Sequence, residues 1–175
     1  MAKNEIKLEM GSYGEIELDR SSSIIFHREF PLLLQKKLSA QFKRKEVEGI
    51  LYRVAKRNAT DAAKTIADSI VGLLGKFNAK KLAEEMLKQF PTRGYGMATL
   101  ESFDPSSKRL VVVVDNCFNS IGVEDPEHTC AIAAGILAGA AFSVTGSEMD
   151  AVETNCVAKG DASCRFELFP TRSWR

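Results

Sequence analysis

Four residues in the C-terminal half have side chains that can bind a metal ion. Cys156 and Cys164 flank a Gly-Asp pair at residues 160–161, Glu153 lies three positions before the first of them, and Cys130 lies further upstream. Such a set is open to three chemistries: a disulfide across a hairpin, thiols buried as small apolar side chains, or a metal site.

The metal chemistry open to these residues is specific. Three thiolates and one carboxylate can complete the tetrahedral shell of zinc, with Zn–S about 2.3 Å and Zn–O about 2.0–2.2 Å. Soft thiolates do not suit magnesium or calcium. Four protein ligands leave no open position on the ion, so we expect a structural site. A reducing cytoplasm makes a disulfide the less favoured alternative.

The two C-terminal cysteines are expected to lie on paired strands. If the chain reverses at residues 160–161, Cys156 lies opposite Cys164, with β-carbons roughly 4.5–5.5 Å apart. Residues three apart on a regular strand point to opposite faces, so Glu153 can join this site only through a bulge at Thr154–Asn155.

Cys130 is expected just inside the start of a helix. Asp125 can cap that helix, and Pro126 suits its first position. Free N–H groups and the positive end of the helix dipole favour a thiolate there. His128 is a rival ligand or, alternatively, a solvated neighbour of the cap. Cys117 is read as a buried thiol or as part of a cavity wall.

The first half of the chain is expected to position these residues through a short β start and then helices. Residues 5–10 and 15–19 alternate apolar and charged side chains, and a third apolar run covers residues 23–27. Residues 28–43 predict a helix with Pro31 in its first turn. A further helix at residues 79–90 has Asn78 as its N-cap and ends at Pro91.

The strongest helical pattern runs from Lys45 to Leu74. Its residues recur at spacings of three and four and so share one face: Val47, Ile50, Leu51, Val54, Asn58, Ala62, Ile66 and Ile70.

The second half predicts the order β-β-α-β-β. Strands are expected at residues 95–103, 109–118, 148–158 and 163–169, with a helix at 127–144. Short turns between strands cannot form parallel crossovers, so we predict an α+β fold, an antiparallel sheet with helices packed on one face. Gly135 and Gly139 of that helix predict a close approach, to the sheet or hairpin rather than to a second subunit.

Length and composition indicate one globular domain over residues 1–175, with an N-terminal β segment at 1–27 and a core at 28–175. The net charge of +1 does not favour direct binding of nucleic acid. The longest apolar run is too short to span a membrane, and the N-terminus lacks a signal-peptide pattern. We therefore expect a cytoplasmic location.

The pattern of Cys130, "ETNC" at 153–156 and "GDASCRF" at 160–166 resembles the 4-vinyl-reductase domain family. This family includes sensory domains of aromatic-responsive transcriptional activators and is related in fold to subunits of the transport-particle tethering complex. By resemblance, Cys130, Glu153, Cys156 and Cys164 would bind zinc. The resemblance also implies a homodimer that encloses a small apolar ligand.

Six apolar or aromatic residues are candidates for lining a ligand pocket: Phe77, Met86, Tyr95, Met97, Phe118 and Phe142. Phenol-sensing relatives bind the hydroxyl with a pocket histidine and tryptophan. The single tryptophan here is Trp174, and neither His27 nor His128 matches that pair, so phenol is not the expected ligand.

We detect no nucleophile–base pair and no phosphate-binding loop, so an enzyme is not expected. The sequence predicts a small-molecule-binding sensory or regulatory domain with structural zinc, acting as a homodimer. Two alternatives stay open: a scaffold or interaction module of the tethering-subunit type, and an accessory protein of tetrapyrrole biosynthesis.

Overall fold

The computed structural model describes residues 8–10, 16–18, 21–23, 27, 29–74, 78–127 and 129–171. Predictions that concern Phe77, His128 or Trp174 lie outside these residues. Within them, no helix combines the length and apolar character needed to cross a bilayer. The division into segments 1–27 and 28–175 stays a prediction.

The C-terminal half forms a four-stranded antiparallel sheet in the order β4-β5-β7-β6. The strands are β4 (Met97–Asp104), β5 (Arg109–Asp115), β6 (Met149–Asn155) and β7 (Cys164–Pro170). Buried and less buried residues alternate along β5 and β7, as expected when only one face of a sheet is covered. The predicted α+β fold and its β-β-α-β-β order are therefore confirmed.

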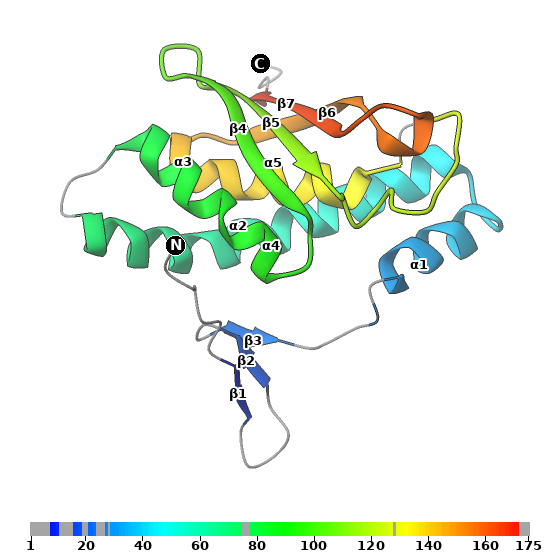
Figure 1. Cartoon of the computed structure of the whole chain (residues 1–175), viewed down its shortest axis with the longest axis horizontal. Helices are drawn as coiled ribbons and strands as arrows, with labels where there is room; N and C mark the ends of the chain where they lie inside the picture. Colours follow the sequence, from blue (N-terminus) through cyan, green and yellow to red (C-terminus); the bar gives the residue numbers. More distant parts are fainter. Residues whose placement is uncertain are drawn as a thin grey trace.

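The helix α5 (Ala131–Thr145) lies against the covered face of the sheet, and the long helix α2 (Arg44–Leu74) lies on the other side of α5 (Figure 1). This position explains the sequence of α5, which has no polar stripe. A helix enclosed between a sheet and a second helix has to be apolar on all sides. Its buried side chains meet Val112, Phe166 and Leu168 in the core.

Two glycines allow α5 and α2 to approach closely. A β-carbon added at Gly139 would lie 2.9 Å from the β-carbon of Ala59, and one added at Gly135 would lie 3.0 Å from that of Ala55. The predicted close approach is therefore present. Its partner is α2, however, and not the sheet or the hairpin, because α2 covers the face of α5 that carries both glycines.

Most of the apolar stripe predicted on α2 is not its buried face, although Val47 at its start is buried. Ala59, Ala63 and Ala67 are buried against the core, while Ile50 and Val54 of the stripe are 53% and 62% exposed. Small side chains are needed where the two helices meet closely. Most of the larger apolar residues of the stripe therefore face outward or toward a cavity.

The remaining helices are α1 (Phe30–Ser39), α3 (Ala79–Leu87) and α4 (Gln89–Thr92). Asn78 caps α3 as predicted, since its side chain accepts a hydrogen bond of 3.0 Å from the N–H of Lys81. Pro91, predicted to end this helix, instead lies inside α4. Because α4 is a single short turn, it depends little on the backbone N–H that proline lacks.

The predicted N-terminal β segment is present as a separate antiparallel sheet. Its strands are β1 (Leu8–Met10), β2 (Ile16–Leu18) and β3 (Ser21–Ser23). The third strand thus precedes the apolar run from which it was predicted, and residues 24–26 lie outside the described part of the chain.

Candidate functional site

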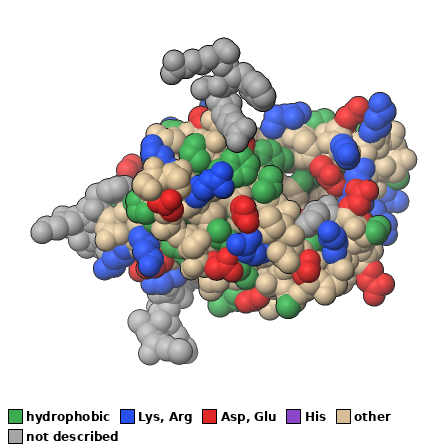
Figure 2. Space-filling model, turned by 90° about the horizontal axis from the view of Figure 1, so that it is seen from above, with side chains coloured by type: hydrophobic (Ala, Val, Ile, Leu, Met, Phe, Trp, Pro, Cys, Tyr) green, Lys and Arg blue, Asp and Glu red, His purple; other side chains and the backbone are tan. Residues whose placement is uncertain are grey.

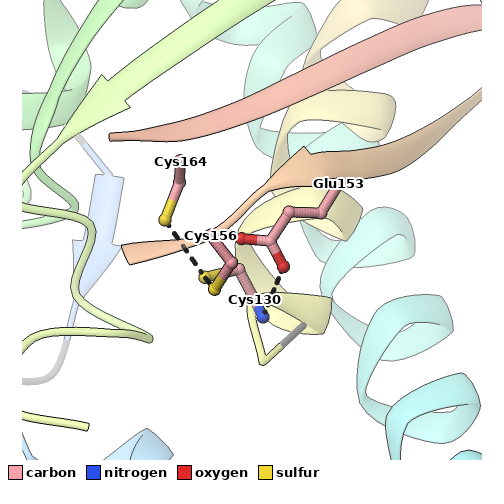
Figure 3. A group of neighbouring side chains, drawn as sticks. All are labelled: Cys130, Glu153, Cys156 and Cys164. Atoms are coloured by element: carbon pink, nitrogen blue, oxygen red, sulfur yellow. Dashed lines mark hydrogen bonds between the residues drawn. The ribbon is translucent and has the colours of Figure 1, made fainter. Parts of the chain in front are cut away.

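The four predicted ligand residues come together from three parts of the chain. One ligand atom from each of Cys130, Glu153, Cys156 and Cys164 lies within 4.8 Å of every other. Figure 3 shows the thiols and the carboxylate pointing toward one another, between the start of α5 and the ends of β6 and β7. All three cysteines are buried. This group could hold a metal ion.

The β6–β7 pair contains the irregularity that the sequence required. The register shifts between Glu153 and Asn155, because Glu153 pairs with Phe166 and Asn155 with Arg165. One residue, Thr154, is therefore extra on β6. The bulge at Thr154–Asn155 is confirmed, and it turns the side chains of Glu153 and Cys156 toward the same site.

The loop after β6 fixes the position of Cys156. A short 3₁₀ turn, η1 (Val157–Lys159), ends at Gly160, whose φ of 98° suits glycine. The N–H of Cys156 donates to the Asp161 carboxylate at 2.8 Å, and the N–H of Val157 donates to the sulfur of Cys164 at 3.5 Å. The loop thus supplies a donor to a ligand sulfur, which favours the thiolate.

Cys130 is the N-cap residue of α5 and not a residue of its first turn. Asp125 and Pro126 therefore lie in the preceding loop, which corrects their prediction as cap and first helical residue. The Asp125 carboxylate instead binds Arg44 of α2 at 2.8 Å. This ion pair holds the loop against α2 and so helps to place Cys130.

Glu153 meets the start of α5 directly. Its Oε2 accepts a hydrogen bond of 3.2 Å from the N–H of Cys130 (Figure 3). Burial raises the pKa of Glu153 to about 7, against an ordinary value of 4.5. A cation beside the carboxylate would favour its charged form and offset this cost.

The sulfur atoms are close without being bonded. The sulfur of Cys130 lies 3.9 Å from that of Cys156 and 3.6 Å from that of Cys164, and all are free cysteines. The disulfide alternative is therefore absent from this structure. Donor sulfurs at this spacing suit a soft ion such as zinc better than a hard ion that prefers oxygen.

Cys117 is a fourth cysteine beside this group. It is fully buried, as predicted for a buried thiol, and its sulfur lies 3.7 Å from that of Cys130. The hydrogen bond between the two thiols lowers the pKa of Cys117 to about 4 and raises that of Cys130. Sequence reasoning did not place Cys117 here, and the only signal was a cysteine two residues after a strand with an apolar centre.

A cavity of about 710 Å³ lies beside α5, among α1, α2, α3 and α4. Its wall is mainly apolar and includes residues of the α2 stripe, Leu51, Val54 and Ile66, together with Ile132 and Ile136 of α5. A cavity of this size suits a small organic molecule. The α2 stripe is therefore largely a cavity wall, which explains why most of it is not packed into the core.

The predicted pocket residues divide between the cavity and other places. Met86, Tyr95 and Phe118 line it. Met97 is 54% exposed and Phe142 lies with its ring 5.7 Å from the Lys64 ammonium; neither belongs to the cavity wall. Phe77 lies outside the described residues. His27, which was not among the predicted pocket residues, also lines the cavity.

The cavity and the cysteine group share two connections. Helix α5 begins beside Cys130, and its next turns supply Ile132 and Ile136 to the cavity. Phe118, which lines the cavity, directly follows Cys117 in the chain. One turn of helix and one peptide bond therefore separate the two places along the chain.

Comparison with known proteins confirms the predicted resemblance. The family model of the 4-vinyl-reductase domain matches residues 110–170, the segment from β5 to β7 that carries all four candidate ligands. A search of curated proteins finds no match to this chain.

Several solved structures share the fold. The phenol-responsive sensory domain of the transcription activator PoxR, solved with phenol, is 18% identical with a TM-score of 0.80, covering 96% of this chain and 87% of that one. A vinyl-4-reductase family protein from Methanocaldococcus jannaschii is 18% identical with a TM-score of 0.51, covering 88% and 86%.

A trafficking protein particle complex subunit 3 from Naegleria fowleri, covalently bound to palmitic acid, is 13% identical with a TM-score of 0.53, covering 85% of this chain and 97% of that one. At these identities the likeness concerns the fold. This likeness in fold agrees with the resemblance to sensory domains and to tethering-complex subunits that the sequence motifs indicated.

Proposed function

We propose that this protein is a small-molecule-binding sensory domain, in which an apolar ligand occupies the cavity and a structural zinc ion is held by Cys130, Glu153, Cys156 and Cys164. The observation that carries the proposal is that the cavity and the cysteine group both meet helix α5, the group at Cys130 and the cavity at Ile132 and Ile136. The fold of the phenol-responsive domain of PoxR supports the sensory role.

The spacing of the sulfurs supports zinc as the ion. Ligands about 2.3 Å from the centre of a tetrahedron lie roughly 3.8 Å from one another. The sulfur of Cys130 lies 3.6 Å from that of Cys164 and 3.9 Å from that of Cys156, close to this value. Bound zinc would neutralise the thiolates and join the start of α5 to the β6–β7 hairpin. Because four protein ligands close the shell, we assign the ion a structural role and no catalysis.

The cavity supports a ligand of mainly apolar character. Burying such a molecule against Leu51, Ile132 and Ile136 would contribute roughly 25 cal/mol for each square ångström of apolar surface removed from water. Contact with α5 gives the ligand a direct route to the metal group. The proposal includes a cytoplasmic location, where the thiols stay reduced and able to bind metal.

The proposal also includes a homodimer. Exposed apolar side chains on α1, on α2 and in the turn between them support it, because Leu33, Phe42 and Ile50 are each more than half exposed. Apolar groups gathered on one side of a protein favour contact with a partner. By contrast, the face in Figure 2 carries acidic and basic side chains dispersed among the hydrophobic ones.

Two measurements test the proposal. Elemental analysis of the purified protein is expected to give one zinc per chain. A neutral fluorescent probe, N-phenyl-1-naphthylamine, is expected to bind the wild-type protein and to lose affinity in Ala62→Trp, since Ala62 lines the cavity with an exposed side chain that a larger one can replace.

Thr65→Trp is the matched control, because Thr65 is exposed on the same helix and does not line the cavity. Equal probe binding by wild type and Ala62→Trp, or purified protein without stoichiometric metal, would contradict the proposal. A partner protein retained through purification, with the cavity inaccessible to probe, would instead favour the scaffold alternative.

A further inference from the structure

The cavity wall carries one residue with a permanent charge. Its polar side chains are those of His27, Asn58, Gln89 and Tyr95, together with Arg93, whose guanidinium is cationic at every physiological pH. Among the described residues, no aspartate or glutamate lines it. An apolar cavity with one permanent cation is complementary to a molecule that is largely apolar and carries one negative charge.

The guanidinium of Arg93 is held in place without being neutralised. Arg93 follows α4, and its Nη1 donates to the neutral side-chain oxygen of Gln89 at 3.2 Å. Within the described part of the chain it forms no ion pair. Arg44, also partly buried, differs in this respect, because it binds the carboxylates of Glu48 and Asp125.

Tyr95 lies near this charge at the same part of the wall. Burial raises the pKa of its phenol, and the positive charge of Arg93 lowers it in part. At neutral pH the phenol therefore keeps its proton. The aromatic rings of Phe90 and Phe118 both pack against that of Tyr95, with centroids 5.6 Å and 5.2 Å away. An anion at Arg93 would thus have aromatic surface beside it for the apolar part of the ligand.

We propose that the ligand is an amphipathic monocarboxylate, whose carboxylate binds the guanidinium of Arg93 and whose apolar body lies along the walls formed by α2 and α5. This inference rests on the proposed ligand-binding function and specifies its ligand class. A carboxylate matches the geometry of a guanidinium, which can donate two parallel hydrogen bonds. It also carries one charge, whereas a phosphate monoester carries nearly two and would meet only one cation.

A pair of isosteric probes tests this charge preference. Decanoate and decanamide share the same apolar chain and differ in the charge of the head group. Each is titrated against the wild-type protein loaded with N-phenyl-1-naphthylamine, and displacement of this neutral probe reports the affinity. We expect decanoate to bind about tenfold more tightly or better, because hydrogen bonds to charged groups are stronger than neutral ones.

Variants locate the preference at Arg93. Arg93→Gln is expected to bind both compounds with similar affinity because the charge is removed, and Arg93→Lys to keep part of the preference because it keeps the charge. Arg53→Gln removes an exposed arginine of α2 that does not line the cavity and should behave as wild type. Thermal unfolding of each variant shows whether it folds.

The outcomes separate this inference from the proposed function. Equal affinities for decanoate and decanamide in the wild type, or an unchanged preference in Arg93→Gln, would overturn the monocarboxylate while leaving an apolar ligand in place. Failure of the neutral probe to bind the cavity at all would overturn both.

Discussion

At the scale of single residues, the metal group and its neighbour Cys117 can be separated by substitution. Cys156→Ser removes a proposed ligand, so we expect loss of zinc and destabilisation on the order of 3–5 kcal/mol, because binding of a structural metal contributes directly to folding. The melting temperature should fall by roughly 10 °C, since each kcal/mol corresponds to about 2–4 °C in a protein of this size. Elemental analysis and calorimetry measure the two effects.

Cys117→Ser is the matched control for this prediction. Cys117 is equally buried and its sulfur lies 3.7 Å from Cys130, but it is not among the four converging ligand residues. This variant should keep one zinc per chain. Loss of zinc in Cys117→Ser together with its retention in Cys156→Ser would show that a different set of residues binds the ion.

The raised pKa of Glu153 predicts a pH dependence for metal-free protein. The pKa is about 7 in the folded protein and 4.5 is its ordinary value, so the folded state holds the proton more strongly between these values. The free energy of unfolding contributed by this group is therefore full below pH 4.5 and is lost as the pH rises through 7. Chelator-treated wild type and Glu153→Gln, unfolded with urea across this range, measure the difference.

In Glu153→Gln this contribution is absent, while those of the other titrating groups remain and cancel in the comparison. Parallel stability profiles for the two chelator-treated proteins would contradict the prediction. In zinc-loaded wild type the trend should reverse, because zinc binds the ionised ligands and competes with protons for them.

The sequence allowed the ligand group to be predicted because a strand has a strict period. A spacing of three between Glu153 and Cys156 is incompatible with a shared face, so convergence required the bulge that the register of β6 and β7 shows. No such local rule applies to Cys117 or Arg93. Their positions depend on how loops and a short helix meet α5, which is a tertiary property.

At the scale of elements, the close contact between α5 and α2 predicts a large effect of one methyl group. Gly139→Ala would place a β-carbon 2.9 Å from that of Ala59 and against the backbone of α2, so the helices would have to separate. We expect destabilisation of about 1–3 kcal/mol. Urea unfolding measures it.

Gly72→Ala is the control, because a β-carbon at Gly72, also in a helix, meets no atom within 4 Å. There the change should stabilise by about 0.5–1 kcal/mol through helix propensity. Destabilisation of similar size in both variants would show that the contact between the helices is not the cause.

The elements themselves were predicted more reliably than their faces. Periodicity identified α2 and the order of the strands, because each pattern is local to its segment. It did not show what the α2 stripe faces, since a core, a cavity and a partner subunit all favour the same apolar side chains. Only the glycines of α5 indicated that small residues would be needed at the helix contact.

At the scale of the whole molecule, the exposed apolar residues of α1 and α2 predict that the protein associates. Leu33 and Ile50 are 51% and 53% exposed, and neither lines the cavity. A carboxylate introduced at such an interface would lose its hydration without gaining a partner of opposite charge. The double variant Leu33→Asp with Ile50→Asp should therefore shift the dimer to monomer. Size-exclusion chromatography with light scattering measures the mass.

Val152→Asp is the matched control for this last prediction. Val152 is also exposed, at 46%, but lies on β6 of the sheet. It should leave the mass unchanged, because the proposed contact between copies uses the helices on the opposite side of the molecule (Figure 1). A wild-type protein that is monomeric at all concentrations, or a dimer broken only by Val152→Asp, would exclude α1 and α2 as the dimer surface. Retained probe binding in the monomeric variant would further show that each cavity is complete within one chain.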